Sequence, residues 1–257
     1  MSEQVAVITG AARGLGKSFT GELLNRGYKV YFCDIDENEG EKSRTEFAVK
    51  YGKENVQFKK CDVRKEEDWK AFFEEVLKKY NRVDLMVNNA GIVHEKEWRR
   101  CVDVNLNGMI QGSMLAIDHM RHRESGKGGI IINVSSLAGV LPVMFSPVYS
   151  ATKSGIIAFT RSWAMNPYVN TNGIRMVCLC PAFADTDIVK NTTEDQFQGK
   201  EYSEALLKRF DIMPVERVTE AFKHLLDDKD NNGQAMIVTA TTMNYVDFPN
   251  PLTQTTS

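Results

Sequence analysis

Seven short runs of apolar, mostly β-branched residues alternate with longer amphipathic stretches along almost the whole chain. This alternation is typical of βαβ units around a parallel sheet, and nearly continuous apolar runs suit strands covered by helices on both faces. The pattern therefore predicts an α/β fold in three layers. The expected strands are Val5–Thr9, Lys29–Cys33, Val56–Lys60, Leu85–Asn88, Gly129–Ser135, Arg175–Cys180 and Ala235–Thr239.

The segments between the runs carry helical periodicity. In Glu67–Tyr80, six large apolar residues recur at the spacing of one helix face, which predicts a helix packed on the sheet. No repeat or Pro/Gly-rich linker divides the 257 residues, so we expect one domain over residues 1–257. The polar stretch Asn191–Phe210 is the exception, and we expect a substrate flap at about residues 187–213.

Composition excludes several classes of function. Lys and Arg number 32 against 34 Asp and Glu, giving a net charge of −2 with no basic block, which argues against a nucleic-acid or anionic-membrane binder. No apolar stretch approaches the ~20 residues of a bilayer span, and no secretory leader is evident, so a cytoplasmic location is expected. Five cysteines without a C-x-x-C pair indicate reduced, buried thiols, and four histidines without ligand spacing predict no metal site.

A glycine-rich turn follows the first expected strand. Residues Thr9–Gly16 contain Gly10, Gly14 and Gly16 and precede a helical stretch, Lys17–Asn25. Glycines allow the backbone to turn tightly and to approach a pyrophosphate, which binds at the positive end of the following helix. The position of the turn, between a strand and a helix, predicts a dinucleotide site.

One acidic residue favours NAD as the dinucleotide. Asp34 comes directly after the second expected strand, where a carboxylate can accept hydrogen bonds from the adenosine ribose. A 2′-phosphate there would meet a like charge, and Ile35 adds no positive charge to offset it. Arg13 could pair with such a phosphate, but we expect it to neutralise Asp34 or to lie in solvent.

Five further motifs follow in order: Asp62-Val63, Asn88-Asn89-Ala90-Gly91, Asn105, Ser135-Ser136 and Tyr149-x-x-x-Lys153. With the glycine-rich turn, they resemble the motif set of the short-chain dehydrogenase/reductase family over roughly the first 190 residues. The resemblance implies a doubly wound Rossmann fold with a seven-stranded parallel sheet, and an NAD-dependent alcohol dehydrogenase activity.

The resemblance gives Asn105, Ser136, Tyr149 and Lys153 as the catalytic set. Tyr149 and Lys153 lie four residues apart in an expected helix, Val148–Ala164, and therefore share a face. A free tyrosine has a pKa of about 10, and a neighbouring ammonium together with the positive nicotinamide ring would lower it, making Tyr149 a general base. Ser136 would hold the substrate oxygen, and Asn105 would hold a water linking Lys153 to solvent.

The same resemblance implies the cofactor contacts. Asn89 and Gly91 would lie beside the cofactor, Asp62 near the adenine, and Thr186 would bond the nicotinamide carboxamide. Ala182 stands where the family has Gly, at a strain cost on the order of 1 kcal/mol if the position needs a positive φ. The full predicted set is Gly10, Arg13, Gly14, Leu15, Gly16, Asp34, Ile35, Cys61, Asp62, Val63, Asn89, Gly91, Tyr149, Lys153, Pro181, Phe183, Ala184 and Thr186.

Within the family, the chain resembles the NAD-dependent 15-hydroxyprostaglandin dehydrogenases, which have Gln where this chain has Ser146. The shorter side chain re-shapes the pocket. The expected substrate contacts are Ser136, Val140, Met144, Ser146, Tyr149 and Phe183, and Leu141, Phe145, Ile188 and Val189 are expected to add to an apolar lining. Such a lining fits an elongated lipophilic secondary alcohol.

Three interpretations of function remain open. The first is an NAD-dependent dehydrogenase of an oxylipin or prostaglandin-like alcohol. The second is a dehydrogenase of a steroid or of a terpene alcohol, as in the insect terpenol dehydrogenases, and the third is a nucleotide-binding scaffold without catalysis. The resemblance also implies a homodimer formed through the helices expected at Val102–Arg121 and Val148–Ala164.

Overall fold

Eight strands form one sheet in the order β3-β2-β1-β4-β5-β6-β7-β8. We analysed a computed structural model, which describes residues 3–121, 128–186 and 211–248. The strands are β1 (Val5–Thr9), β2 (Lys29–Asp34), β3 (Val56–Lys60), β4 (Leu85–Asn88), β5 (Gly129–Val134), β6 (Ile174–Pro181), β7 (Ala235–Val238) and β8 (Met243–Tyr245). All seven predicted strands are present and pair in parallel.

The prediction of an all-parallel, seven-stranded sheet was wrong at one edge. β8 pairs antiparallel with β7, with Val238 opposite Met243. A tight turn makes this return, since the N–H of Thr239 donates to the carbonyl of Thr242 at 2.9 Å. Three residues are too few for a period-2 pattern to be visible in the sequence.

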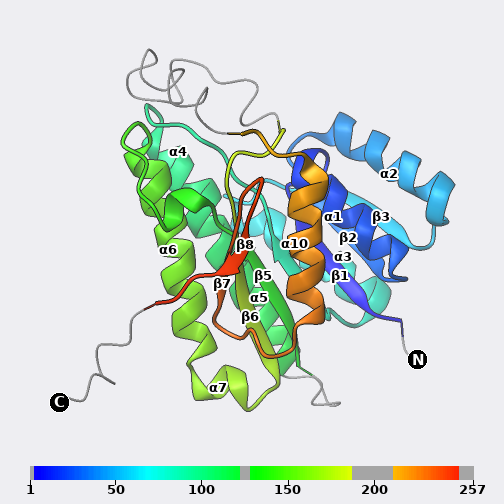
Figure 1. The fold of residues 1–257 in the computed structure, drawn as a ribbon. Helices are drawn as coiled ribbons and strands as arrows, with labels where there is room; N and C mark the ends of the chain where they lie inside the picture. Colours follow the sequence, from blue (N-terminus) through cyan, green and yellow to red (C-terminus); the bar gives the residue numbers. More distant parts are fainter. Residues whose placement is uncertain (1–2, 122–127, 187–210, 249–257) are drawn as a thin grey trace.

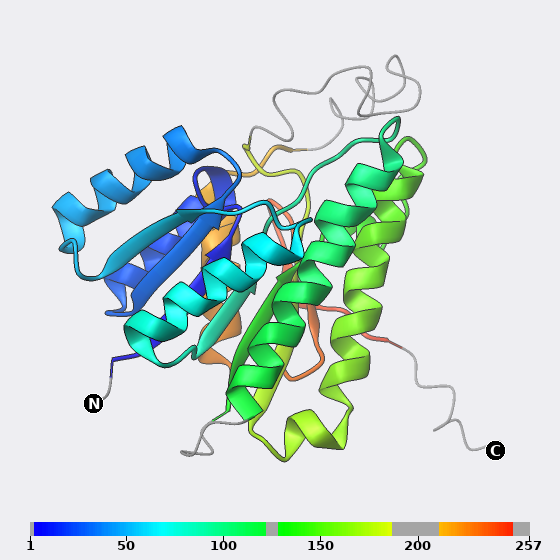
Figure 2. The ribbon, with the colours of Figure 1, turned by 180° about the vertical axis from the view of Figure 1, so that it is seen from behind.

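Helices cover both faces of the sheet, as the three-layer prediction required. One face carries α1 (Gly14–Asn25), α2 (Glu37–Tyr51) and α10 (Val215–Asp227), in front of the sheet in Figure 1. The other face carries α3 (Glu66–Tyr80), α5 (Gly108–Arg121) and α6 (Pro147–Ala164), in front in Figure 2. Two short helices, α4 (Trp98–Val102) and α7 (Pro167–Asn170), precede α5 and follow α6.

The strands divide their side chains between the two layers. In β1, Ala6 and Ile8 face one apolar cluster, whereas Val5 and Val7 face the other. On the first face, the rings of Phe19 and Phe222 stack with centroids 4.3 Å apart and join α1 to α10. Both faces are buried, which explains why the strands read as continuous apolar runs.

The sheet order places a crevice above β1 and β4. β1 lies between β2 and β4, so the chain winds outward from it in both directions. In an open α/β sheet, the carboxyl ends of the strands at this reversal are separated by diverging loops and form the ligand-binding crevice. The glycine-rich turn follows β1, and the Asn88–Gly91 turn follows β4.

Two other predictions concern the chain as a whole. All five cysteines lie in the described part of the chain, and each is buried and unpaired, as expected. Among the described residues, no helix is both long and apolar enough to cross a bilayer. Most of the predicted flap, including Ile188 and Val189, falls outside the described residues.

Candidate active site

A cavity of about 730 Å³ opens at the carboxyl ends of the central strands. Twenty-two of the residues predicted to contact cofactor or substrate line it, from the glycine-rich turn at one end to the turn after β6 at the other. These residues are Gly10, Arg13, Gly14, Leu15, Asp34, Ile35, Cys61, Asp62, Val63, Asn89, Gly91, Ser136, Leu141, Met144, Phe145, Ser146, Tyr149, Lys153, Pro181, Phe183, Ala184 and Thr186.

Close backbone approach accounts for the glycines of the first turn. Gly10 has a φ of +63°, and a Cβ on it would lie 2.7 Å from the Cα of Ala90. A Cβ on Gly16 would lie 2.4 Å from the carbonyl oxygen of Gly10, so Gly16 supports the turn without lining the cavity. The side-chain amide of Asn89 donates to the carbonyls of Thr9 and Gly10, at 2.9 and 2.8 Å. The two turns are thus locked together.

The first turn of α1 is open to an anion. Its N-cap residue, Arg13, makes no side-chain cap bond among the described residues. Uncapped N–H groups and the positive helix end favour a phosphate there. The guanidinium of Arg13 pairs with Asp36, a partner that we did not predict.

Asp34 is oriented by the backbone. One of its carboxylate oxygens accepts the N–H of Ala12 at 3.0 Å, and the other accepts the N–H of Asp36 at 3.1 Å. Each carboxylate oxygen has a second acceptor site, so Asp34 can still accept from a ligand hydroxyl.

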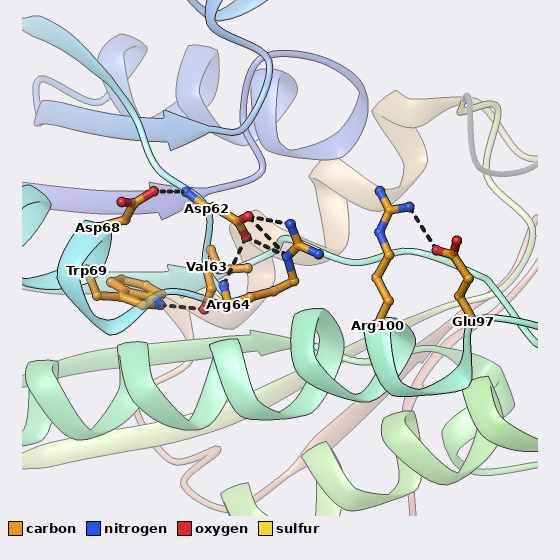
Figure 3. A network of polar contacts seen from close by, with 7 residues as sticks. All are labelled: Asp62, Val63, Arg64, Asp68, Trp69, Glu97 and Arg100. Carbon is orange, nitrogen blue, oxygen red and sulfur yellow. Dashed lines mark hydrogen bonds and ion pairs between the residues drawn. The ribbon is translucent and has the colours of Figure 1, made fainter.

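The turn Asp62–Arg64 is braced by α3 (Figure 3). The N–H of Asp62 donates to Asp68 at 2.8 Å, and the indole of Trp69 donates to the carbonyl of Val63 at 2.9 Å. The guanidinium of Arg64 pairs with both oxygens of Asp62 and lowers the pKa of that carboxyl below its ordinary value. Sequence reasoning did not predict Arg64, although a basic residue two positions after an acid in a turn is a visible signal.

Tyr149 and Lys153 share one face of α6, as predicted. The ammonium of Lys153 lies 5.5 Å from the centroid of the Tyr149 ring and donates to the carbonyl of Val134 at 3.0 Å. Ser136 lines the same cavity, so the structure brings three of the four predicted catalytic side chains to one site.

The lowered pKa expected for Tyr149 beside a bound nicotinamide ring stays a prediction, and in the protein alone the pKa is raised. Burial, the largest cause, raises this pKa to about 12, and the hydrogen bond with Ser136 opposes the rise. Burial also lowers the pKa of Lys153 to about 8. Both shifts have one physical reason: removal from water disfavours the charged form of either group.

Asn105 lies behind this group and does not line the cavity. A π-helical turn, Asp103–Asn107, interrupts the single helix that we predicted over Val102–Arg121. The amide of Asn105 accepts the N–H of Ile92 and donates to the Ile92 carbonyl, both at 2.8 Å, and it donates to Thr152 at 3.2 Å. The side chain therefore fixes the loop after β4.

The substrate-side wall differs in part from the prediction. Val140 was expected to face the pocket but instead packs against the cluster formed by α5, α6 and β6. Met144 lines the cavity and is 79% exposed. Ser146 is buried, and its hydroxyl has no hydrogen-bond partner among the described residues.

The turn after β6 carries no backbone strain. Among the described non-glycine residues only Asn81 has a positive φ, so Ala182 adopts an ordinary conformation and the strain considered above is absent. Thr186 lies beside the glycine-rich turn, since a Cβ on Gly14 would be 3.6 Å from the Thr186 methyl group.

Comparison with known proteins agrees with this geometry. The family model of short chain dehydrogenases matches residues 4–197. The 15-hydroxyprostaglandin dehydrogenase [NAD(+)] of Mus musculus is 36% identical over 242 residues, covering 92% of this chain and 90% of the relative. The Homo sapiens protein of the same name is 34% identical over 241 residues, covering 92% and 91%.

Solved structures share the fold. A 3-ketoacyl-(acyl-carrier-protein) reductase from Brucella melitensis, complexed with NADH, superposes with a TM-score of 0.78 at 26% identity, covering 93% of this chain and 97% of that one. Levodione reductase superposes with a TM-score of 0.83 at 22% identity and the same coverage, which bears on the fold alone. The chain is therefore a member of the short-chain dehydrogenase/reductase family.

Proposed function

We propose that this protein oxidises a lipophilic secondary alcohol to the ketone with NAD as hydride acceptor. The observation that carries the proposal is the grouping of Ser136, Tyr149 and Lys153 on the wall of a cavity whose far end is the glycine-rich turn with Asp34. A binding end and a reaction end within one cavity suit a dinucleotide that reaches from one to the other.

The residues present fit NAD. Gly10 lies so close to Ala90 that the turn carries no side chain where a pyrophosphate would lie. The free N–H groups at the start of α1, which has no side-chain cap among the described residues, would bind the negative charge of the pyrophosphate. Asp34, already oriented by two N–H groups, would accept the ribose hydroxyls and disfavour a 2′-phosphate. The relatives named above for NAD(+) cover most of this chain, which also supports NAD.

Tyr149 would act as the base of the reaction. Its phenolate takes the proton from the substrate hydroxyl as the carbinol carbon gives up hydride, and Ser136 donates a hydrogen bond to the same oxygen. NAD supplies the hydride acceptor and, when bound, a positive ring. Burial raises the pKa of Tyr149 to about 12 although Lys153 already lies beside the ring, so the positive nicotinamide ring would supply the further stabilisation of the phenolate.

The substrate class follows from the lining. Leu141, Val143, Phe145 and Phe183 give the reaction end an apolar wall. The unpartnered hydroxyl of Ser146 adds one polar position within it. We therefore propose an oxylipin or prostaglandin-like alcohol, in which an apolar body carries a few oxygens.

A substrate panel tests the proposal. Oxylipins including prostaglandin E2, terpenols and hydroxysteroids are offered with NAD and, in parallel, with NADP, and NADH formation is followed by absorbance. We expect turnover of an oxylipin with NAD and at least about tenfold less with NADP. Preferred turnover of a terpenol or a steroid would replace the proposed substrate class. No NADH formation with any alcohol of the panel would favour a nucleotide-binding scaffold without catalysis.

We also propose a homodimer formed through α5 and α6. Met114 on α5 is 42% exposed, an apolar side chain that a partner copy would cover. Sedimentation of the protein and of Met114→Glu tests this, since the charged variant is expected to shift toward monomer.

A further inference from the structure

The helix that carries Tyr149 and Lys153 is capped by a distant carboxylate. The N–H groups of Val148 and Tyr149 donate to the two oxygens of Glu95, at 3.1 and 3.0 Å. Pro147 has no N–H, and the N–H of Ser150 donates to the carbonyl of Ser146 at 2.8 Å. Glu95 thus completes the first turn of α6, although it lies more than fifty residues earlier in the chain.

A local cap is available but is not used. Ser146 occupies the N-cap position, and serine is among the residues preferred there. Its side chain makes no cap bond and its hydroxyl has no partner in the described part of the chain. Helix stability alone therefore does not explain why Glu95 is held here, only 5% exposed. Burying a carboxylate is costly unless N–H donors and a helix terminus compensate it.

Glu95 belongs to the loop that faces Lys153. A Cβ on Gly91 would lie 3.3 Å from the Lys153 ammonium, so the backbone of this loop forms the wall beside that group. Asn105 fixes both the N–H and the carbonyl of Ile92 in the same loop. Residues 91–95 thus lie along one side of the reaction end, with Ile92 held by Asn105 and Glu95 held by the first turn of α6.

The Tyr149 peptide is attached to this loop from both sides. Its N–H donates to Glu95, while its carbonyl accepts the hydroxyl of Thr152 at 2.7 Å. Thr152 in turn accepts a hydrogen bond from Asn105, the side chain that holds Ile92. Two independent routes, one through Glu95 and one through Thr152, join the backbone of Tyr149 to residues 91–95.

We propose that Glu95 is a positioning residue for the reaction. It fixes the height of Tyr149 above the sheet relative to Ser136 and to the wall formed by Gly91, and so sets the reach of the phenol toward the substrate oxygen. The inference rests on the proposed function. Because misplacement of a reacting group by about 1 Å can cost roughly 100-fold in rate, a small displacement of α6 would be visible in kcat.

Three variants test this inference. Glu95→Ala removes both contacts, and Glu95→Gln keeps one acceptor oxygen. Glu216→Gln is a matched control, since Glu216 is an exposed acid in the first turn of another helix, α10, and does not line the cavity. We expect kcat to fall about 10- to 100-fold in Glu95→Ala and less in Glu95→Gln, with the control within about twofold. The dissociation constant for NAD, measured by calorimetry, is expected to change less than about threefold in all three.

An isotope effect distinguishes positioning from stability. With a substrate deuterated at the carbinol carbon, the isotope effect on kcat is expected to rise in Glu95→Ala, because hydride transfer becomes slower than the other steps. Assays are run well below each variant's melting temperature, with folding checked by circular dichroism.

The possible outcomes separate the two proposals. An unchanged kcat in folded Glu95→Ala overturns the positioning role while turnover by the wild type keeps the proposed function. A loss of melting temperature without a loss of kcat assigns Glu95 to helix capping alone and also overturns it. If the wild type turns over none of the alcohols, both the proposed function and this inference are rejected.

Discussion

The two ends of the cavity treat charge in opposite ways. At the binding end, beside the glycine-rich turn, Asp34 accepts two backbone N–H groups, and Asp62 is paired with Arg64, which lowers the pKa of Asp62. At the reaction end, burial raises the pKa of Tyr149 and lowers that of Lys153. At the first end an ion pair favours the charged form of Asp62, whereas at the second burial disfavours the charged forms of Tyr149 and Lys153.

This difference indicates a division of work between the two halves of the sheet. A binding end benefits from groups that are already ionised and oriented, because little reorganisation is then needed on binding. A reaction end benefits from a base whose charged form depends on what is bound beside it. Substitutions at either end of the cavity test that division.

Tyr149→Phe is expected to affect only the reaction end. Loss of the phenol removes the base, so kcat should fall by about 10²- to 10⁴-fold, while the calorimetric dissociation constant for NAD stays within about threefold. Tyr168→Phe, on the exposed α7, is the matched control. A weakened NAD affinity as large as the loss of kcat would contradict the division.

Asp34→Asn is expected to affect only the binding end. The amide keeps one acceptor but loses the charge, so kcat/KM with NAD should fall about tenfold and the ratio of NAD to NADP efficiency should narrow. Steady-state rates with both cofactors measure this. Glu41→Gln, which removes one surface carboxylate paired with Arg44 and remote from the cavity, should leave the ratio unchanged. An equal narrowing of the NAD-to-NADP ratio in both variants would show that the net charge of the protein, and not the Asp34 carboxylate, sets the cofactor preference.

Lys153→Met should stabilise the fold as it removes activity. The pKa of Lys153 is about 8 in the folded protein against 10.5 for a free lysine, so at pH 7 the folded state holds a buried ammonium at a cost. Allowing for the lost bond to Val134, we expect a gain of about 1–2 kcal/mol in the free energy of unfolding, measured with urea.

The lowered pKa of Lys153 also determines how the free energy of unfolding changes with pH. Between pH 8 and 10.5 the unfolded chain binds a proton that the folded chain does not, so the stability of the wild type should rise with pH in that window. The gain in the free energy of unfolding from Lys153→Met should therefore become smaller over the same pH range. Lys42→Met, at an exposed lysine, should show neither effect. Equal stability of wild type and Lys153→Met at pH 7 would contradict the buried-charge account.

Arg64→Ala should produce the smallest change. Loss of the guanidinium lets the pKa of Asp62 rise toward its ordinary value and loosens the turn, so KM for NAD should increase about two- to fivefold with kcat unchanged. Initial rates at varied NAD measure this against Arg44→Ala, whose surface pair with Glu41 is remote from the cavity. A reduced kcat would mean that the Asp62 turn also shapes the reaction end.

The sequence predicted the sheet well because its strands are buried on both faces. Continuous apolar runs such as Val5–Thr9 gave all seven parallel strands, and the glycines of the first turn could be assigned from the close approach that only glycine permits. β8 was missed because three residues show no period.

Contacts between distant parts of the chain could not be predicted. Glu95 looks like a surface charge in the sequence, and only the fold brings it to the start of α6. Val140 follows the Ser-Ser motif closely, yet the 3₁₀ turn Leu137–Gly139 directs it away from the cavity. The pKa of Tyr149 depends on burial, which is a property of the whole fold.

The π-helical turn at Asp103–Asn107 has a consequence for engineering this scaffold. It holds about one residue more than the same length of α-helix would, so deleting a single residue there would restore a regular α-helix and leave Met109 and Ala116 of α5 in the apolar layer. The deletion would instead shift Asn105, whose amide holds both backbone groups of Ile92. Chimeras that join two homologous chains near Asn105 must therefore take all of residues 103–107 from one parent, even where the two sequences differ there.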